Sequence, residues 1–194
     1  MLKHKNPLII VTAPSGAGKT TIVRHLINKF PQLAFSVSAT NRPKREKETD
    51  GRDYYFISTE NFKNKIANQE FLEYEEVYAG RFYGTLKSEL ERLWVEKKCI
   101  IFDVEVHGAL NIQKAYPEND LSVFIMPPSK EILYERLKKR NTETAETLIQ
   151  RMARAEEELT FAPRFNSVIV NDNLQEALVQ AEILVTDFLK KNEL

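Results

Sequence analysis

The chain contains short, uninterrupted runs of apolar residues separated by more polar stretches. The runs that we expect to form strands cover residues 8–12, 34–38, 99–106, 121–126 and 168–171. Each run is continuous rather than alternating between apolar and polar positions, which is typical of strands that are covered on both faces. The pattern therefore predicts five buried strands.

Helical patterns lie between these runs. Residues 87–98 place Leu90, Leu93 and Trp94 on one helical face, and Ser129 is a suitable N-cap for a later helix. The other expected helices cover residues 20–30, 130–140, 145–159 and 174–189. Strands that alternate with helices indicate an α/β fold, with a parallel five-stranded sheet and helices on both faces.

Two segments interrupt this alternation. Residues 39–86 are rich in charge and tyrosine, with extended stretches at 54–58 and 71–78 and a short helix near 60–69. We interpret them as a small α+β lobe inserted into the core. Residues 137–151 are polar and carry arginines near both ends, which suggests a mobile lid. The core would then consist of residues 1–38, 87–136 and 152–194.

Composition narrows the class of protein. The 194 residues include 28 basic and 28 acidic side chains, so the formal net charge is +0. This balance argues against bulk electrostatic binding of nucleic acid or of a membrane surface. The single cysteine, Cys99, excludes a disulfide within the chain. No apolar run reaches the length of a membrane span or a signal sequence, so we expect a cytoplasmic protein.

A phosphate-binding motif follows the first predicted strand. It consists of Ala13, Pro14, Ser15, Gly16, Ala17, Gly18, Lys19 and Thr20. Gly16 and Gly18 let backbone N–H groups approach phosphates closely, and the following helix adds its positive N-terminal end. Lys19 would reach the β- and γ-phosphates, and the Thr20 hydroxyl would bind Mg²⁺. The alternative is an ordinary strand–turn–helix corner, since the usual first glycine is Ala13 here.

A second group of motifs lies in residues 35–54 and 80–85. Together with the P-loop, these segments resemble the guanylate kinase family, nucleoside monophosphate kinases that transfer the γ-phosphoryl group of ATP to GMP. The resemblance continues to residues 168–172 and so covers nearly the whole chain. It implies a three-layer P-loop fold, ATP and Mg²⁺ as co-substrate and cofactor, and GMP as acceptor. It also implies dGMP as a further acceptor and a role in the supply of GTP and dGTP.

The resemblance implies a binding site for the GMP phosphate. Arg42 and Arg45 would clamp this phosphate, because guanidinium groups match phosphate oxygens in two-point contacts. Tyr54 and Tyr83 would donate hydroxyl hydrogen bonds to it, and their alternative role is core packing. The charged run 44–48 is interpreted as a solvated loop.

The guanine base would be recognised by Glu73 together with Ser38 and Thr85. The N1–H and N2–H₂ groups of guanine are donors, so an ionised carboxylate is their natural partner. Adenine presents an acceptor at N1 and would leave that carboxylate unpaired, which discriminates strongly against it.

Two acidic residues end the strand expected at 99–106. Asp103 and Glu105 are two positions apart, so both should project to one face. Asp103 would hold Mg²⁺ directly or through water, and Glu105 would make a second guanine contact. The family usually has Asp at position 105. A solvated strand end is the alternative, although acids at this end of parallel strands usually face a ligand crevice.

The resemblance assigns catalytic roles to Arg136, Arg140 and Arg151, which would stabilise charge on the transferred phosphoryl group. Asn171 matches a family position near the adenine of ATP. Asn141 stands where glycine is common in the lid. We interpret His107 as a turn or helix-start residue, since phosphoryl transfer needs positioning more than proton removal.

Two other functions remain open at this stage. A non-catalytic module of guanylate-kinase type could bind protein partners, although such a module need not keep Lys19, Thr20 and the lid arginines. Another P-loop kinase could act on a different acceptor, against which Glu73, Ser38 and Thr85 speak. The expected partners are the small molecules ATP and GMP, without nucleic acid or membrane, and the oligomeric state stays undecided between monomer and homo-oligomer.

Overall fold

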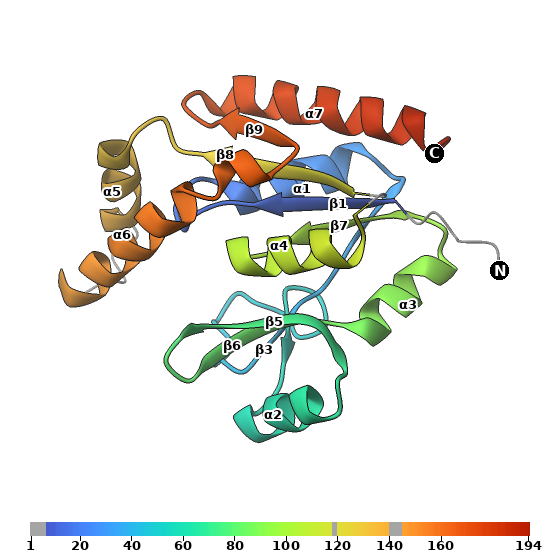
Figure 1. The fold of residues 1–194 in the computed structure, drawn as a ribbon, viewed down its shortest axis with the longest axis vertical. Helices are drawn as coiled ribbons and strands as arrows, with labels where there is room; N and C mark the ends of the chain where they lie inside the picture. Colours follow the sequence, from blue (N-terminus) through green and yellow to red (C-terminus); the bar gives the residue numbers. More distant parts are fainter. Residues whose placement is uncertain (1–6, 118–119, 140–144) are drawn as a thin grey trace.

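The computed structural model describes residues 7–117, 120–139 and 145–194. Its core is a five-stranded parallel sheet with strand order β2-β7-β1-β8-β9 (Figure 1). The strands are β1 (Leu8–Thr12), β2 (Leu33–Phe35), β7 (Cys99–Asp103), β8 (Asp120–Met126) and β9 (Ser167–Val170). The α/β fold with a parallel five-stranded core is therefore confirmed.

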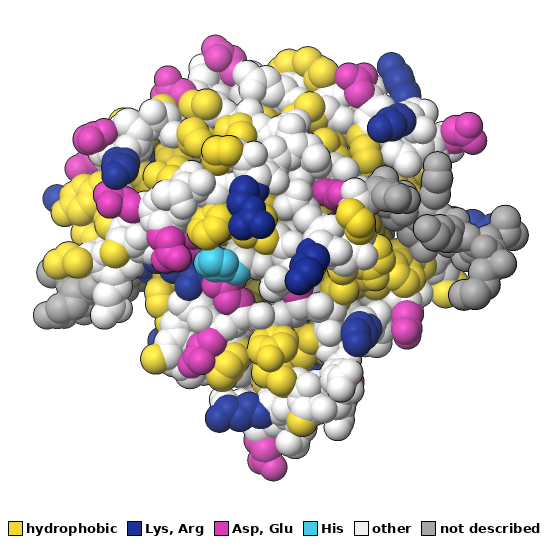
Figure 2. All heavy atoms as spheres, in the orientation of Figure 1, with side chains coloured by type: hydrophobic (Ala, Val, Ile, Leu, Met, Phe, Trp, Pro, Cys, Tyr) yellow, Lys and Arg dark blue, Asp and Glu magenta, His cyan; other side chains and the backbone are white. Residues whose placement is uncertain are grey.

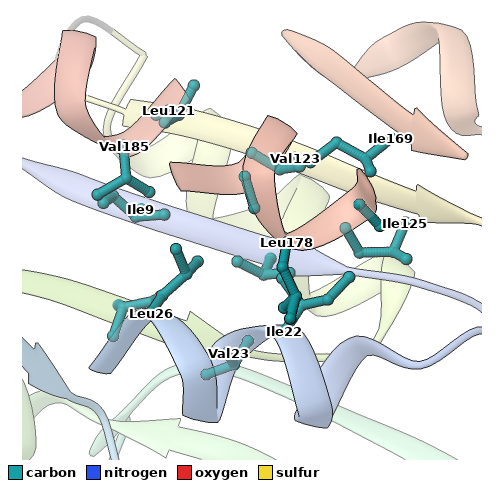
Figure 3. Packing of buried hydrophobic residues seen from close by; sticks show 14 of the residues in the cluster. Ile9, Ile22, Val23, Leu26, Leu121, Val123, Ile125, Ile169, Leu178 and Val185 are labelled. Atoms are coloured by element: carbon teal, nitrogen blue, oxygen red, sulfur yellow. The ribbon is translucent and has the colours of Figure 1, made fainter. Parts of the chain in front are cut away.

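Helices cover both faces of this sheet, which explains why its strands are continuously apolar. Along β1, Ile9 and Val11 join one buried cluster, whereas Leu8 and Ile10 join another on the opposite face. The first cluster packs against α1 (Lys19–Lys29) and α7 (Leu174–Lys191), as Figure 3 shows. The second packs against α3 (Lys87–Val95) and α4 (Val106–Ala115). Both side-chain directions of a strand thus reach a dry interior.

Two predicted strand boundaries are wrong. β7 ends at Asp103, and Val106 begins α4, so the run expected as one strand at 99–106 contains a strand end and a helix start. β2 also stops earlier than expected. The backbone N–H of Val37 donates to Glu89 Oε1 of α3 at 3.1 Å, which draws the chain away from the sheet.

Residues 39–86 form their own four-stranded sheet, in the order β4-β3-β6-β5. Its elements are β3 (Ala39–Thr40), β4 (Tyr55–Phe56), α2 (Thr59–Ala67), β5 (Phe71–Tyr78) and β6 (Arg81–Leu86). Ala39, Phe62, Phe71 and Leu86 make a separate small core, in which the rings of Phe62 and Phe71 stack with centroids 4.4 Å apart. This lobe lies below the main sheet in Figure 1.

Beyond the left end of the main sheet in Figure 1 lie α5 (Lys130–Lys138) and α6 (Ala145–Leu159), and the short helix η1 (Ala162–Arg164) follows α6 in the chain. Leu133, Leu137 and Ala155 form a small cluster that holds α5 and α6 together. Acidic and basic side chains are interspersed over the face in Figure 2, in keeping with the balanced charge. Among the described residues, none of the helices combines the length and apolar character that crossing a membrane requires.

Candidate active site

The P-loop connects β1 to α1 and is held by Asn171. Gly16 and Gly18 have φ values of +95° and +100°, in the region that favours glycine. The Asn171 amide donates from Nδ2 to the Ala17 carbonyl at 2.7 Å. A Cβ added at Gly18 would lie 2.3 Å from that same Nδ2. Gly18 also caps α1 without a side-chain hydrogen bond, so the helix N-terminus faces the loop with a positive end.

Lys19 lies among acceptors at the carboxyl end of β7. Its Nζ donates to the Val104 carbonyl at 2.8 Å and lies 3.0 Å from Asp103 Oδ1 and 3.9 Å from Glu105 Oε1. Burial disfavours the charge on Lys19, but the carboxylates of Glu105 and Asp103 outweigh it and raise the pKa of Lys19 above its usual value. The Thr20 hydroxyl donates to Asp103 Oδ2 at 2.9 Å.

Asp103 and Glu105 both reach Lys19, but not as neighbours on one strand. Asp103 is the last residue of β7, whereas Glu105 is the N-cap of α4 with φ −70° and ψ 163°. The expectation that one strand carries both side chains is therefore wrong. They meet because parallel strands and the helices that follow them open at the same edge of the sheet.

Glu73 on β5 is buried with an exposed fraction of 7%, and Thr85 on β6 is fully buried beside it. The Thr85 hydroxyl donates to Glu73 Oε1 at 2.6 Å. Burial raises the pKa of Glu73 to about 7; the hydrogen bonds from Thr85 oppose this shift, and the charges of Glu75 and Glu105 add to it. Glu105 thus acts on both Glu73 and Lys19, which links the two predicted sites.

Arg42 and Tyr54 lie together in the lobe. The Arg42 guanidinium is 4.9 Å from the centroid of the Tyr54 ring, and the rings of Tyr54 and Tyr83 meet edge to face at 5.9 Å. Burial and the charge of Asp103 raise the pKa of Tyr54 to about 12, so its hydroxyl stays a donor. Arg45 is exposed, and its backbone N–H donates to Glu48 Oε2 at 2.8 Å.

Ser38 lies at the base of the lobe, partly buried, and its carbonyl accepts a hydrogen bond from the Tyr55 N–H at 2.9 Å. Its neighbour Ala39 is paired with Gly84, next to Thr85. The structure therefore brings Ser38 to the strands that carry the Glu73–Thr85 pair.

Two of the predicted catalytic arginines lie on described helices, Arg136 on α5 and Arg151 on α6. Arg136 Nη2 donates to the Asn171 carbonyl at 2.9 Å, which places Arg136 beside the residue that holds the P-loop. The Arg151 guanidinium lies 5.9 Å from the centroid of the Tyr78 ring, at the end of β5. Arg140 and Asn141 lie outside the described residues.

Comparison with known proteins decides the family. The model of the guanylate kinase family matches residues 4–188. The chain belongs to the guanylate kinase family. Curated guanylate kinases from Bacteroides fragilis and Porphyromonas gingivalis are 49% and 47% identical, covering 94% and 95% of this chain and 89% and 98% of those relatives. The solved structure of guanylate kinase from Anaplasma phagocytophilum superposes with a TM-score of 0.73 at 26% identity, over 94% of this chain and 85% of that one.

Membership of the guanylate kinase family makes the chain a nucleoside monophosphate kinase, an enzyme that uses ATP as phosphoryl donor. The solved structure of TT1252 from Thermus thermophilus shares the fold at a TM-score of 0.54 and 16% identity.

The structure also corrects one expectation about the charged run 44–48. The run 44–48 is not wholly a solvated loop, because the Glu48 carboxylate pairs with Arg42 through contacts of 2.5 and 2.7 Å.

Sequence reasoning missed Glu48 and two residues of α6, Arg154 and Glu158. The Arg42 hydrogen bonds hold the pKa of Glu48 at about 2. Glu48 could have been suspected from its place six residues after Arg42 in the same loop. Arg154 and Glu158 offered no such signal, because Arg154 bonds to Glu75 and Val77, far away in the sequence.

Proposed function

We propose that this kinase binds the ATP phosphates in its P-loop and GMP against the lobe 39–86, and transfers the γ-phosphoryl group directly between them. The observation that carries the choice of acceptor is the buried Glu73 carboxylate with its Thr85 hydrogen bond. Guanine offers N1–H and N2–H₂ donors to this carboxylate. Adenine would leave it unpaired in a buried place, which costs far more than a missing contact in water.

On the GMP side, Arg42, Arg45, Tyr54 and Tyr83 would bind the phosphate. The ring contacts of Arg42 with Tyr54 support this assignment, since they hold the guanidinium fork in one orientation. The Glu48 carboxylate accepts hydrogen bonds from Nη1 and Nη2 of Arg42 at 2.7 and 2.5 Å, so the phosphate would meet the other N–H groups of Arg42. Ser38 and Glu105 would complete the base site around Glu73 and Thr85, and dGMP is a further acceptor because none of these contacts is directed at the ribose 2′-hydroxyl.

On the ATP side, the backbone from Ala13 to Thr20 would surround the phosphates, and Asn171 would keep the loop in shape. Thr20 and Asp103 suit Mg²⁺, because the Thr20 hydroxyl and Asp103 Oδ2 lie 2.9 Å from each other and both are oxygen ligands. No group of three or more His, Cys, Asp or Glu in the described part of the chain forms a metal cage. Mg²⁺ in kinases usually takes only one or two protein ligands beside the substrate phosphates, as Thr20 and Asp103 would provide. The ion would neutralise charge on the phosphate oxygens.

The catalytic contribution of the chain would be alignment and charge. Lys19 would contact the β- and γ-phosphates, and Arg136, Arg140 and Arg151 would contact the equatorial oxygens of the moving phosphoryl group. The place of Arg136 beside Asn171 and of Arg151 beside Tyr78 supports this, since these residues border the two nucleotide sites. No general base is needed, because the acceptor is an already ionised phosphate.

We further propose that the chain works as a core of residues 1–38, 87–136 and 152–194 with two moving parts. These are the GMP-binding lobe 39–86 and the lid 137–151, which would close over both nucleotides and exclude water. Its partners would be small molecules rather than nucleic acid or membrane, in the cytoplasm.

The test is a coupled assay with ATP, Mg²⁺ and a panel of nucleoside monophosphates. We expect GMP to be the best acceptor, dGMP to be used, and AMP, CMP and UMP to be poor. A panel in which another monophosphate exceeds GMP would assign the chain to a different acceptor. A protein that binds GMP but transfers nothing would be a binding module instead.

A further inference from the structure

A partly buried cluster of charged side chains lies between α6 and the lobe strand β5. Arg154 of α6 donates from Nη1 to the Val77 carbonyl at 2.7 Å, from Nη2 to Glu75 Oε1 at 2.5 Å and from Nε to Glu158 Oε1 at 2.8 Å. The Arg154, Glu75 and Glu158 side chains are exposed by only 22%, 15% and 2%. One arginine therefore joins the lobe to α6, whose first half belongs to the predicted lid.

This contact lies on the functional face of both elements. Glu73 and Glu75 are two positions apart in the regularly paired part of β5, so their side chains share one face of the strand, and Arg154 reaches the backbone carbonyl of Val77 just beyond them. Arg151 and Arg154 are one helical turn apart on α6, and each guanidinium lies 5.9 Å from the centroid of the Tyr78 ring. The strand that would read guanine is thus joined to the helix that would supply Arg151 to the phosphoryl group.

Arg154 is the cation that pairs with both Glu75 and Glu158 in this cluster. Burial raises the pKa of Glu158 to about 7, and the charge of Glu105 adds to the effect while Arg154 opposes it. In the described part of the chain, Glu75 Oε2 is buried without a hydrogen-bond partner. Removing Arg154 would take away the cation that Glu75 and Glu158 share and would raise the pKa of Glu158 further, so that β5 and α6 lose the ion pair and hydrogen bonds that join them.

We propose that Arg154 is a positioning residue that couples the guanine site to α6, the helix that carries Arg151. By holding Glu75 and the Val77 carbonyl against α6, it keeps Glu73 and Arg151 in the relative places that transfer requires. This inference rests on the proposed function, because it assumes that GMP binds at Glu73. Arg154 itself would touch neither nucleotide.

The test compares Arg154→Gln, Glu75→Gln, the double variant and the control Arg164→Gln. Arg164 lies on η1 just after α6, with its guanidinium 5.9 Å from the centroid of the Phe161 ring of the same segment. We expect Arg154→Gln to raise KM for GMP on the order of tenfold, which is within the usual range for coupling between two sites. KM for ATP should change less than about twofold. Glu75→Gln should behave alike, the double variant should be no worse than the more affected single one, and the control should match the unmodified enzyme.

Equal rises in KM for both nucleotides, or additive effects of the two substitutions, would show that Arg154 only stabilises the fold. Glu75→Gln tests the contact from the other side if Arg154→Gln does not fold. Hydrogen exchange of the 71–78 amides without nucleotide separates this proposal from the proposed function. Faster exchange in Arg154→Gln, but not in Arg164→Gln, supports the contact even if GMP proves not to be the acceptor. Unchanged exchange and unchanged KM for GMP would overturn it.

Discussion

At the scale of single residues, Lys19 is the side chain on which the chemistry depends most. It is held by the Val104 carbonyl and two carboxylates in a position where the γ-phosphate would add a further partner. We predict that Lys19→Ala lowers kcat by about 10²–10³, the usual cost of losing one contact to transition-state charge. Lys29→Ala is the matched control, because Lys29 ends the same helix and pairs with Glu182 at the surface. Near-normal turnover of Lys19→Ala would contradict the P-loop assignment.

Glu73 leads to a prediction about pH. Its pKa of about 7 in the free protein means that it is partly protonated near neutrality, whereas guanine requires the ionised form. GMP binding should therefore release a proton near pH 6.5, and KM for GMP should rise as pH falls below 7. Calorimetry in buffers of different ionisation enthalpy measures this release. The GMP phosphate titrates with a pKa of about 6 as well, so Glu73→Gln, which keeps that titration, is the control.

The same group links stability to pH. An unfolded glutamate has a pKa near 4.5, and the folded value for Glu73 is about 7. The folded state therefore binds the proton more tightly, and the stability that this provides is complete below about 4.5 and lost as pH rises through about 7. We predict that the Tm of the free protein falls more between pH 5 and 8 than the Tm of Glu73→Gln. Parallel Tm profiles would show that Glu73 titrates normally.

Among the helices and strands, α4 shows where prediction of secondary structure from the apolar pattern fails. The helices and strands of the core were mostly predictable, because apolar runs and helical spacing alternate clearly. α4 was not, because its start merges with the apolar run of β7 and Gly108 weakens its helical pattern. The structure explains the glycine: a Cβ at position 108 would lie 2.6 Å from Glu73 Oε2. This reason comes from another lobe and is invisible in the local sequence.

Gly108→Ala should therefore act on the site rather than on the helix. Alanine favours a helix interior over glycine by about 1 kcal/mol, but its methyl group would displace the Glu73 carboxylate. We predict a raised KM for GMP, little change in KM for ATP and a Tm that is not much lowered. Asn111→Ala, an exposed change in the same helix, should leave both KM values unchanged. An unaltered KM for GMP in Gly108→Ala would mean that Glu73 moves aside freely.

Across the whole molecule, the sequence predicted which residues form the site better than it predicted the contacts between the lobes. Asp103 and Glu105 were expected on one face, and Glu73 was expected beside Thr85; both pairs lie close together, and Lys19, which was assigned to the ATP phosphates, lies beside Asp103 and Glu105. The contacts between lobes, such as Arg154 with Glu75, depend on how two separately folded sheets are placed. Charged residues on a helix usually face solvent, so nothing in the pattern indicated that Arg154 would pack against the lobe.

These contacts bear on how the lobe and the lid would close over the nucleotides. Repulsion between the arginines of the lobe and those of the lid would hold the site open, but Glu48 neutralises Arg42 and Glu75 already joins the lobe to α6. The force for closing would then come mainly from the nucleotide phosphates, which Arg42 and Arg45 would approach from the lobe and Arg136 and Arg151 from α5 and α6. We predict that a bisubstrate ligand, two nucleosides joined by a phosphate chain, binds more tightly than either nucleotide and lowers the radius of gyration in solution scattering. Arg154→Gln should begin from a larger radius without ligand and reach the same compact state with it. An identical radius with and without ligand at proven saturation would mean that lobe and lid are fixed, and that Arg154 holds a rigid site rather than one that closes.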